Sequence, residues 1–222
     1  MADSKSILMV VTSHDRIDDD HPTGLWFEEF AVPYSLFQQQ GYRVTVASPR
    51  GGAVPIDPRS EPKERDAADV RAALDALADT ARLDAVSSQP FDAVFFPGGH
   101  GTMYDLPDNP DVSRLVGRFA DENKVLASVC HGPACFVGAK RKDGTPVVKG
   151  KRLTAFTNAE ESAVELDKFM PFLLESRLRD LGARFETADN WADHVVVDGH
   201  IVTGQNPQSS GSAAREVIKL LS

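Results

Sequence analysis

Hydrophobic residues along this chain gather in short continuous runs, which are separated by longer segments with a helical period. The four clearest runs are apolar at nearly every position, so we expect them to be central, parallel strands. They cover residues 6–12, 42–47, 91–96 and 125–129. Apolar residues three and four positions apart predict helices over residues 24–40, 66–82 and 111–123. This alternation predicts an α/β fold with a mostly parallel sheet that is covered on both faces.

The second half of the chain has a weaker pattern. In chain order we expect a strand, a helix, the two segments of a small antiparallel pair, and a closing helix: residues 153–156, 170–181, 184–187, 194–202 and 207–221. The turn of the pair falls at Asp198-Gly199. The sequence contains no internal repeat or low-complexity stretch, so we expect a single domain over 1–222 with an antiparallel element in roughly 184–204.

The net charge of the chain argues against some classes of binding partner. The chain has 222 residues, with 24 Lys and Arg against 33 Asp and Glu, which gives a net charge of −9. The longest basic run is Lys140-Arg141-Lys142, so we expect neither a nucleic acid nor an anionic membrane as partner. The apolar run of residues 7–11 is too short for a secretory core or a membrane span. We expect a cytoplasmic protein with reduced cysteines.

Cys130 stands where the buried strand of residues 125–129 stops and a helical segment starts. This position predicts a nucleophile elbow, which exposes a side chain at the end of the strand, and the small neighbour Gly132 lets the turn close. Helix N–H groups facing the sulfur would lower the pKa of the thiol. A packed structural cysteine is the alternative for Cys130, and it is our expectation for Cys135 on the following helix.

A glycine-rich turn, residues 97–102, follows the strand of residues 91–96. Loops at the carboxyl ends of neighbouring parallel strands converge on one crevice, so this turn should face Cys130. The backbone N–H groups of Gly98, Gly99 and His131 are the candidates for an oxyanion and substrate site. By itself the turn is a weak signal, because Pro-Gly-Gly is also a common loop breaker. No dinucleotide fingerprint follows the first strand, and we expect no cofactor.

Two glutamates are candidates for acid–base chemistry. Pro33 should disturb its helix at Glu29, which borders the apolar stripe, whereas we expect Glu28 to point outward. Burial there would raise the pKa of Glu29, as a general base or a proton-holding partner of a thiolate requires. A first-turn glutamate that complements the helix dipole is an equal alternative. Glu161 lies three positions after Asn158, a spacing that a helix cap explains without catalysis.

Taken together, the motifs resemble the PfpI superfamily, most closely its glutathione-independent glyoxalase branch of small heat-shock-protein-31-like chaperones and glyoxalases. The resemblance implies a flavodoxin-like α/β sandwich of three layers. It also implies that Cys130 is the nucleophile, that Glu29 is the acid contacting its sulfur, and that His131 and Glu161 complete a Cys-His-Glu triad. The motifs are VCHGP at 129–133, PGGHGT at 97–102, Thr23-Gly24 with Glu29 and Pro33, Phe156-Thr157 with Glu161, and TGQNP at 203–207.

The resemblance further implies an activity. Members of that branch convert methylglyoxal to lactate without glutathione or metal. The expected chemistry is a Cys130 hemithioacetal, with Glu29 and His131 moving protons through an enediolate. The expected partners are methylglyoxal or glyoxal and a second copy of the chain in a homodimer. Glu160 stands beside Glu161, which leaves the triad acid open by one residue.

Several alternatives remain open at this level. A cysteine peptidase or amidohydrolase would use the same thiolate, histidine and oxyanion site. A stress chaperone, a protein deglycase or a redox sensor oxidised at Cys130 is also compatible with the motifs. A glutamine amidotransferase is disfavoured because no downstream His-x-Glu pair is found. Residues 14–21 contain two histidines and several aspartates that could bind zinc, but a solvated acidic loop is the commoner meaning, so we expect no metal.

Overall fold

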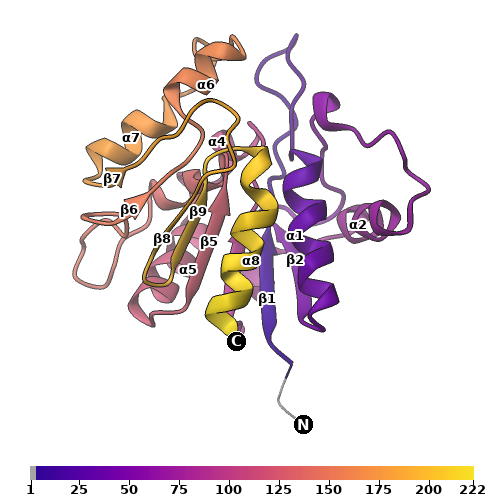
Figure 1. The fold of residues 1–222 in the computed structure, drawn as a ribbon, viewed down its shortest axis with the longest axis horizontal. Helices are drawn as coiled ribbons and strands as arrows, with labels where there is room; N and C mark the ends of the chain where they lie inside the picture. The colour runs from indigo at the N-terminus through magenta and orange to yellow at the C-terminus, as the bar shows by residue number, and fades with distance from the viewer. Residues whose placement is uncertain (1–3) are drawn as a thin grey trace.

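A seven-stranded sheet forms the middle layer of the protein, seen in a computed structural model that describes residues 4–222 (Figure 1). The strand order is β3-β2-β1-β4-β5-β9-β8, and every pairing is parallel except that of β8 with β9 at one edge. The strands are β1 (Ser6–Val10), β2 (Arg43–Ser48), β3 (Ala81–Arg82), β4 (Ala93–Phe96), β5 (Val125–Val129), β8 (Val195–Asp198) and β9 (Ile201–Gly204).

Helices cover both faces of this sheet, and alternate strand positions point to opposite faces. In β1, Ile7 and Met9 pack into one core with α1, α2 and α8, while Leu8 and Val10 pack into the other with α3 and α5. Figure 1 shows α1 and α8 side by side on the first face. The helices are α1 (Phe27–Gln39), α2 (Ala68–Ala78), α3 (Leu83–Val86), α5 (Pro110–Asp121) and α8 (Ser210–Leu221).

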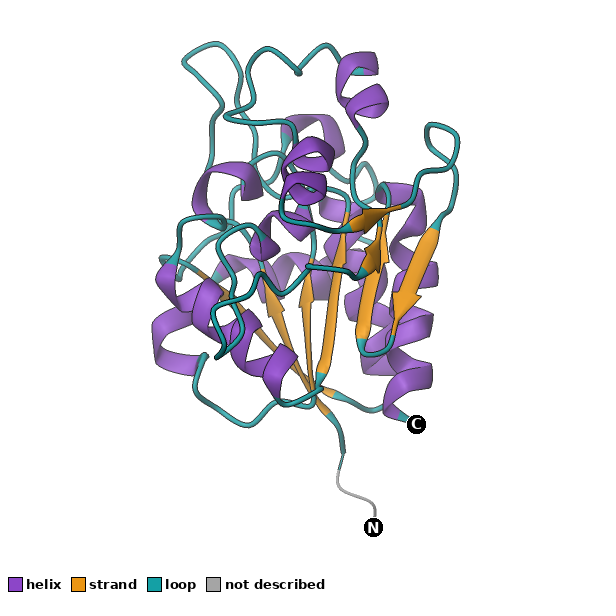
Figure 2. Ribbon diagram, turned by 90° about the vertical axis from the view of Figure 1, so that its left-hand side faces the viewer, coloured by secondary structure: helices purple, strands orange, loops and turns teal. Residues whose placement is uncertain are grey.

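Shorter elements gather beyond the carboxyl ends of the parallel strands (Figure 2). They include the 3-10 helix η2, which follows β5 directly, and a separate two-stranded sheet in which β6 pairs with β7 in parallel. Because every connection at this edge starts where a buried strand stops, side chains from distant segments converge here. These elements are η1 (Pro58–Ser60), α4 (Thr102–Asp105), η2 (Gly132–Phe136), β6 (Arg152–Leu153), α6 (Asn158–Ala163), α7 (Leu174–Asp180), β7 (Arg184–Phe185) and η3 (Pro207–Ser209).

The four strands predicted from apolar runs and the three-layer α/β arrangement are confirmed. The predicted antiparallel pair is partly wrong. A hairpin does turn at Asp198-Gly199, but its strands are β8 and β9, and residues 184–185 pair instead with β6. The hairpin is also not a separate element, since β9 lies beside β5 in the main sheet. Ile201 and Val202 are fully buried, because they face the two opposite cores of that sheet. Among residues 4–222, no helix is both long and apolar enough to cross a membrane.

Candidate active site

Cys130 occupies a strained turn between β5 and η2. Its φ is 59°, in the left-handed region that non-glycine residues rarely adopt. The backbone is held on both sides, since Cys130 N donates to Gly204 O at 2.9 Å and Phe156 N donates to Cys130 O at 2.9 Å. A side chain on Gly132 would lie 2.1 Å from Phe96 O, so only glycine lets the turn close. The chain therefore forms the elbow that its sequence predicts.

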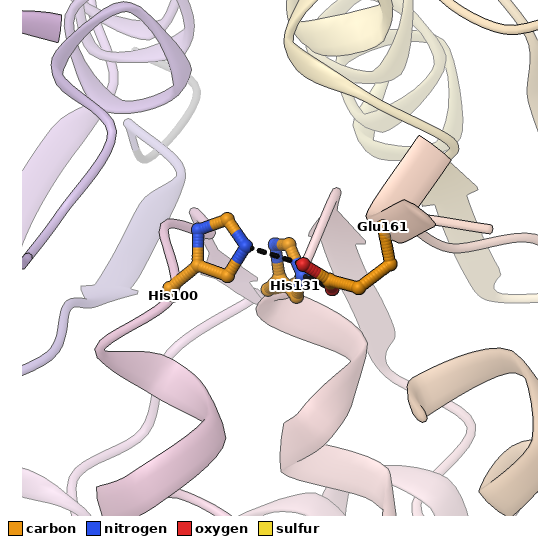
Figure 3. A group of neighbouring side chains, drawn as sticks. All are labelled: His100, His131 and Glu161. Atoms are coloured by element: carbon orange, nitrogen blue, oxygen red, sulfur yellow. Dashed lines mark hydrogen bonds and ion pairs between the residues drawn. The ribbon is translucent and has the colours of Figure 1, made fainter. Parts of the chain in front are cut away.

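The structure brings Cys130, His131 and Glu161 together, all of them buried. Cys130 Sγ lies 3.4 Å from His131 Nδ1. His131 Nε2 lies 2.6 Å from Glu161 Oε2 (Figure 3). Burial acts to raise the pKa of Glu161, but the charge of His131 and the hydrogen bonds from both histidines hold it far below its usual range. A carboxylate only accepts hydrogen bonds, so His131 Nε2 carries a proton and Nδ1 faces the thiol.

Glu160 has a structural role that differs from the role of Glu161. The cap of α6 is Thr157, whose Oγ1 accepts from Glu160 N at 3.0 Å, while Glu160 Oε2 accepts from Thr157 N at 3.0 Å. The capping box thus lies one residue earlier than the Asn158-to-Glu161 spacing suggested, and Glu161 is free to face His131. Glu160 also accepts from Trp191 N at 2.9 Å, and so ties a distant loop to the helix start.

Glu161 has a second histidine partner that sequence reasoning left without a role. His100 Nε2 lies 2.7 Å from Glu161 Oε1, and Arg59 Nη2 donates to His100 Nδ1 at 3.2 Å. A guanidinium can only donate, so Nδ1 is the unprotonated nitrogen and Nε2–H donates to Glu161. Burial and then the charge of His131 lower the pKa of His100 to about 4. His100 is therefore neutral at neutral pH.

Arg59 is fixed in turn by Asp57. Arg59 Nε and Nη2 donate to the two carboxylate oxygens at 2.9 and 2.7 Å, and Thr23 Oγ1 donates to Asp57 at 2.8 Å. One line of hydrogen-bonded side chains thus runs from Thr23 to the Cys130 sulfur. Arg59 and Asp57 belong to a loop rich in Gly and Pro, where no periodicity marks a functional position. His100 offered a signal, as a histidine within the turn that was expected to face Cys130.

Glu29 lies on the other side of the sulfur and is fully buried, whereas Glu28 is exposed, as predicted. Glu29 Oε2 accepts from Gly98 N at 2.7 Å. Oε1 has no nitrogen or oxygen partner within the described residues, and the carboxyl interacts with the Cys130 thiol. Burial raises the pKa of Glu29 to about 8, against the opposing effect of those two contacts. The carboxyl therefore holds its proton at neutral pH.

The electrostatics of Cys130 differ from the sequence-based expectation. Burial raises the pKa of the thiol, and the nearby Glu29 carboxylate raises it further. Helix N–H groups do not reverse this, because the segment that follows is a short 3-10 helix in place of a long α-helix. Glu29 and Cys130 are coupled acids, since ionisation of either raises the pKa of the other. With the pKa of Glu29 at about 8 and that of the thiol raised above its usual value, both groups hold their protons at neutral pH.

The glycine-rich turn faces Cys130, but its glycines have different roles. Gly98 N–H is occupied by Glu29, so Gly98 fixes that carboxyl and is not available as an oxyanion donor. The N–H groups of Gly99 and His131 have no nitrogen or oxygen acceptor within residues 4–222, and the His131 N–H interacts with the Cys130 sulfur. Both residues line a cavity of about 300 Å³ that also reaches Cys130. Cys135 is buried in the core on the opposite face of the sheet, as expected.

His100, His131 and Glu161 also form the one group within the described part of the chain whose ligand atoms lie close enough for a metal, within 4.8 Å of one another (Figure 3). Each of these atoms is already used in the Glu161 hydrogen bonds, and the Arg59 cation adjoins His100. We interpret the group as a hydrogen-bonded network. In the acidic loop, His14 stacks on Tyr104 and His21 pairs with Asp18.

Comparisons with known proteins identify the family of the chain. The DJ-1/PfpI family model matches residues 26–220. The glutathione-independent glyoxalase hsp3101 of Schizosaccharomyces pombe is 34% identical, covering 99% of this chain and 97% of that protein. The X-ray structure of the 24 kDa rapid encystment protein of Francisella tularensis superposes with a TM-score of 0.90 at 33% identity, over 98% of this chain and 99% of that one. The crystal structure of glyoxalase III from Candida albicans superposes with a TM-score of 0.88 at 27% identity, over 97% of each chain. The resemblance inferred from the motifs is confirmed, and the chain belongs to the DJ-1/PfpI family.

Proposed function

We propose that this protein is a glutathione-independent glyoxalase that converts methylglyoxal to lactate, with Cys130 as nucleophile and no cofactor. The observation that carries the proposal is the buried Glu29 carboxyl beside the Cys130 thiol, with a pKa of about 8. A group that titrates near the working pH both gives and takes protons readily, as the isomerisation of a dicarbonyl requires. Relatives in which glyoxalase activity is named match this chain along nearly its whole length.

The first step forms a carbon–sulfur bond. The Cys130 thiol gives its proton to His131 Nδ1, 3.4 Å away, and the Glu161 carboxylate stabilises the imidazolium. The sulfur adds to the aldehyde carbon, and Glu29 gives its proton to the aldehyde oxygen. The N–H groups of Gly99 and His131 stabilise the charge that develops on this oxygen. The product is a neutral hemithioacetal beside a Glu29 carboxylate.

The second step moves hydrogen between the two carbons. The Glu29 carboxylate takes the proton of the former aldehyde carbon, and His131 protonates the ketone oxygen, which gives an enediol. Glu29 then returns its proton to the former ketone carbon, while His131 takes the proton of the first oxygen. The first carbon is oxidised to a thioester and the second is reduced to an alcohol, so no external oxidant or reductant is needed.

Water completes the reaction. It adds to the thioester carbon, Glu29 takes a proton from the water, and the sulfur leaves with the proton of His131. Lactate is released, and Cys130, His131 and Glu29 return to their starting protonation states. The net change is the addition of one water to methylglyoxal. An amidohydrolase would use the same thiol and histidine, but it gives no task to a protonated carboxyl beside the sulfur. Glu29 therefore favours the glyoxalase.

The direct test is lactate formation from methylglyoxal in chelator-treated buffer without glutathione. The wild type is compared with Cys130→Ser and with Cys135→Ser, the matched control in which the buried core cysteine is changed. We expect lactate from the wild type and from Cys135→Ser, and none above background from Cys130→Ser. Lactate from a folded Cys130→Ser protein, or none from the wild type, would refute the proposal.

A further inference from the structure

The cavity next to Cys130 is larger than methylglyoxal needs. It measures about 300 Å³. One water takes about 30 Å³ in the liquid, so the cavity has room for on the order of ten water-sized groups. Gly99, Cys130 and His131 form its reactive end. A substrate whose only substituent is a methyl group would leave much of the remaining space to solvent.

One side of the cavity is an aromatic wall that begins beside His131. The Phe156 ring lies 4.4 Å from the His131 ring between centroids, and the Trp191 ring lies 5.7 Å from Phe156. Val164 and Pro207 line the same cavity. The wall therefore leads from the reacting histidine outward to Trp191, which is 39% exposed at the surface. Such surfaces bind flat apolar groups by offset or tilted stacking.

Trp191 is held in this wall against its backbone preference. Its φ is 66°, a conformation that is costly for a bulky side chain and that marks functional positions when the surroundings enforce it. Trp191 N donates to Glu160 Oε1 at 2.9 Å. The same oxygen accepts from Gln205 Nε2 at 3.1 Å and from Asn206 Nδ2 at 2.9 Å. A buried carboxylate thus fixes the loop that presents the indole.

We propose that Phe156 and Trp191 form a subsite for a bulky, flat, apolar substituent on the ketone carbon of the substrate. The inference rests on the proposed glyoxalase function and names its substrate class: 2-oxoaldehydes that carry an aromatic group, of which phenylglyoxal is the simplest. With the aldehyde carbon at Cys130, the ketone substituent points along the wall, where the ring stacks on the indole.

Binding can be measured without chemistry. The two hydroxy acids that would be products, mandelate and lactate, are titrated into Cys130→Ser by calorimetry. We expect mandelate to bind at least about tenfold tighter, since burying and stacking one ring contributes on the order of the 1.4 kcal/mol that a factor of ten represents. In Cys130→Ser/Trp191→Gly this preference should fall to about threefold or less. Glycine is chosen because it tolerates the φ of Trp191.

Turnover gives the second readout. In Trp191→Gly, kcat/KM for phenylglyoxal should fall about tenfold, mainly through KM, while that for methylglyoxal changes about threefold or less. Phe169→Ala is the matched control, because this aromatic side chain is exposed but does not line the cavity. Equal binding of mandelate and lactate, or a mandelate preference that survives Trp191→Gly, would overturn the subsite. A mandelate preference that depends on Trp191, in a protein that turns over neither aldehyde, would support the subsite and refute the glyoxalase.

Discussion

His100 Nε2 lies 2.7 Å from Glu161 Oε1, on the carboxylate oxygen that His131 does not use. Glu161 is therefore held from two sides by ring N–H groups, one from the histidine next to Cys130 and one from a histidine that never reaches the sulfur. Arg59 fixes the tautomer of His100, so this second donor does not depend on pH in the neutral range. The arrangement keeps Glu161 ionised and correctly oriented toward His131.

Removal of this second donor should show in the pH profile. In His100→Leu, Glu161 loses one of the hydrogen bonds that lower its pKa, so that pKa rises and the carboxylate is lost at a higher pH. A hydrogen bond to a charged group contributes about 1.5–3 kcal/mol, so we expect the acid limb of kcat/KM to move up by about one pH unit or more. The kcat/KM for methylglyoxal at pH 7 should fall about tenfold, because a Glu161 carboxylate held from one side only orients His131 less well.

His100→Gln provides the control for that prediction. Its side-chain amide can place an N–H near the position of the histidine Nε2, so the acid limb should return most of the way to its wild-type position. An unshifted limb in a folded His100→Leu protein would show that His100 only fills space. Equal shifts in both variants would also contradict a role that depends on the donated hydrogen bond.

The raised pKa of Glu29 predicts a pH-dependent stability. The folded value of about 8 lies above the ordinary 4.5, so the folded protein keeps a proton that the unfolded chain releases between these pH values. Stability should therefore fall as pH rises through this window. Glu29→Gln removes that contribution. Between pH 5 and pH 8 the free energy of unfolding should therefore fall less in this variant than in the wild type, by on the order of 3 kcal/mol. Urea denaturation at both pH values measures it, and an identical pH dependence in the two proteins would contradict the buried, protonated carboxyl.

Gly98→Ala should displace Glu29. A Cβ at this position would lie 2.6 Å from Glu29 Oε2, 2.7 Å from His131 N and 2.8 Å from Val129 O. Catalytic groups that move by about 1 Å cost about 10²-fold in rate, so lactate formation should fall by that factor. The matched control is Gly211→Ala in α8, where the nearest atom would be 3.4 Å away. Full activity in Gly98→Ala would mean that the Gly98 hydrogen bond does not position Glu29.

The two cysteines should differ in reactivity. Cys130 lines the cavity, whereas Cys135 packs in the core. Burial raises the pKa of both thiols, so access through the cavity decides which of them reacts. Iodoacetamide should therefore modify Cys130 in the folded protein and Cys135 only after unfolding. Peptide mapping after a timed reaction, with Cys130→Ser as the control, measures this. Equal labelling of both cysteines in the folded state would contradict the placement of Cys135.

Much of this fold could be predicted because its central strands are buried on both faces and read as unbroken apolar runs. Cys130 could be placed for the same reason, since an elbow needs a buried strand, a small residue such as Gly132 and a helical start. Glu29 could be separated from Glu28 because the apolar stripe of one helix defines its buried side. In each case the local sequence pattern and the tertiary environment favour the same position for the residue or strand.

The features that could not be predicted from the sequence depend on contacts between distant segments. Residues 184–185 form too short a strand for periodicity to choose a partner, and only packing places them beside β6. Arg59 reaches His100 across a loop whose Gly and Pro give no period, so no spacing marked it. The cap of α6 was misplaced by one residue because Thr157 and Asn158 are both good cap residues. The raised pKa of Cys130 follows from complete burial, which sequence does not reveal.

The central claim is that Cys130 adds to the aldehyde and that Glu29 then moves the proton, and one measurement separates these two steps. Glu29→Gln is mixed with methylglyoxal that carries carbon-13 at the aldehyde carbon. The hemithioacetal on Cys130 is followed by carbon-13 NMR of the intact protein, with Cys130→Ser as the control, and lactate is assayed chemically. Solvent can protonate the hemithioacetal oxygen in place of Glu29, so we expect the hemithioacetal signal in Glu29→Gln but not in Cys130→Ser, with no lactate above the uncatalysed rate. Lactate formed by Glu29→Gln at the wild-type rate would contradict it.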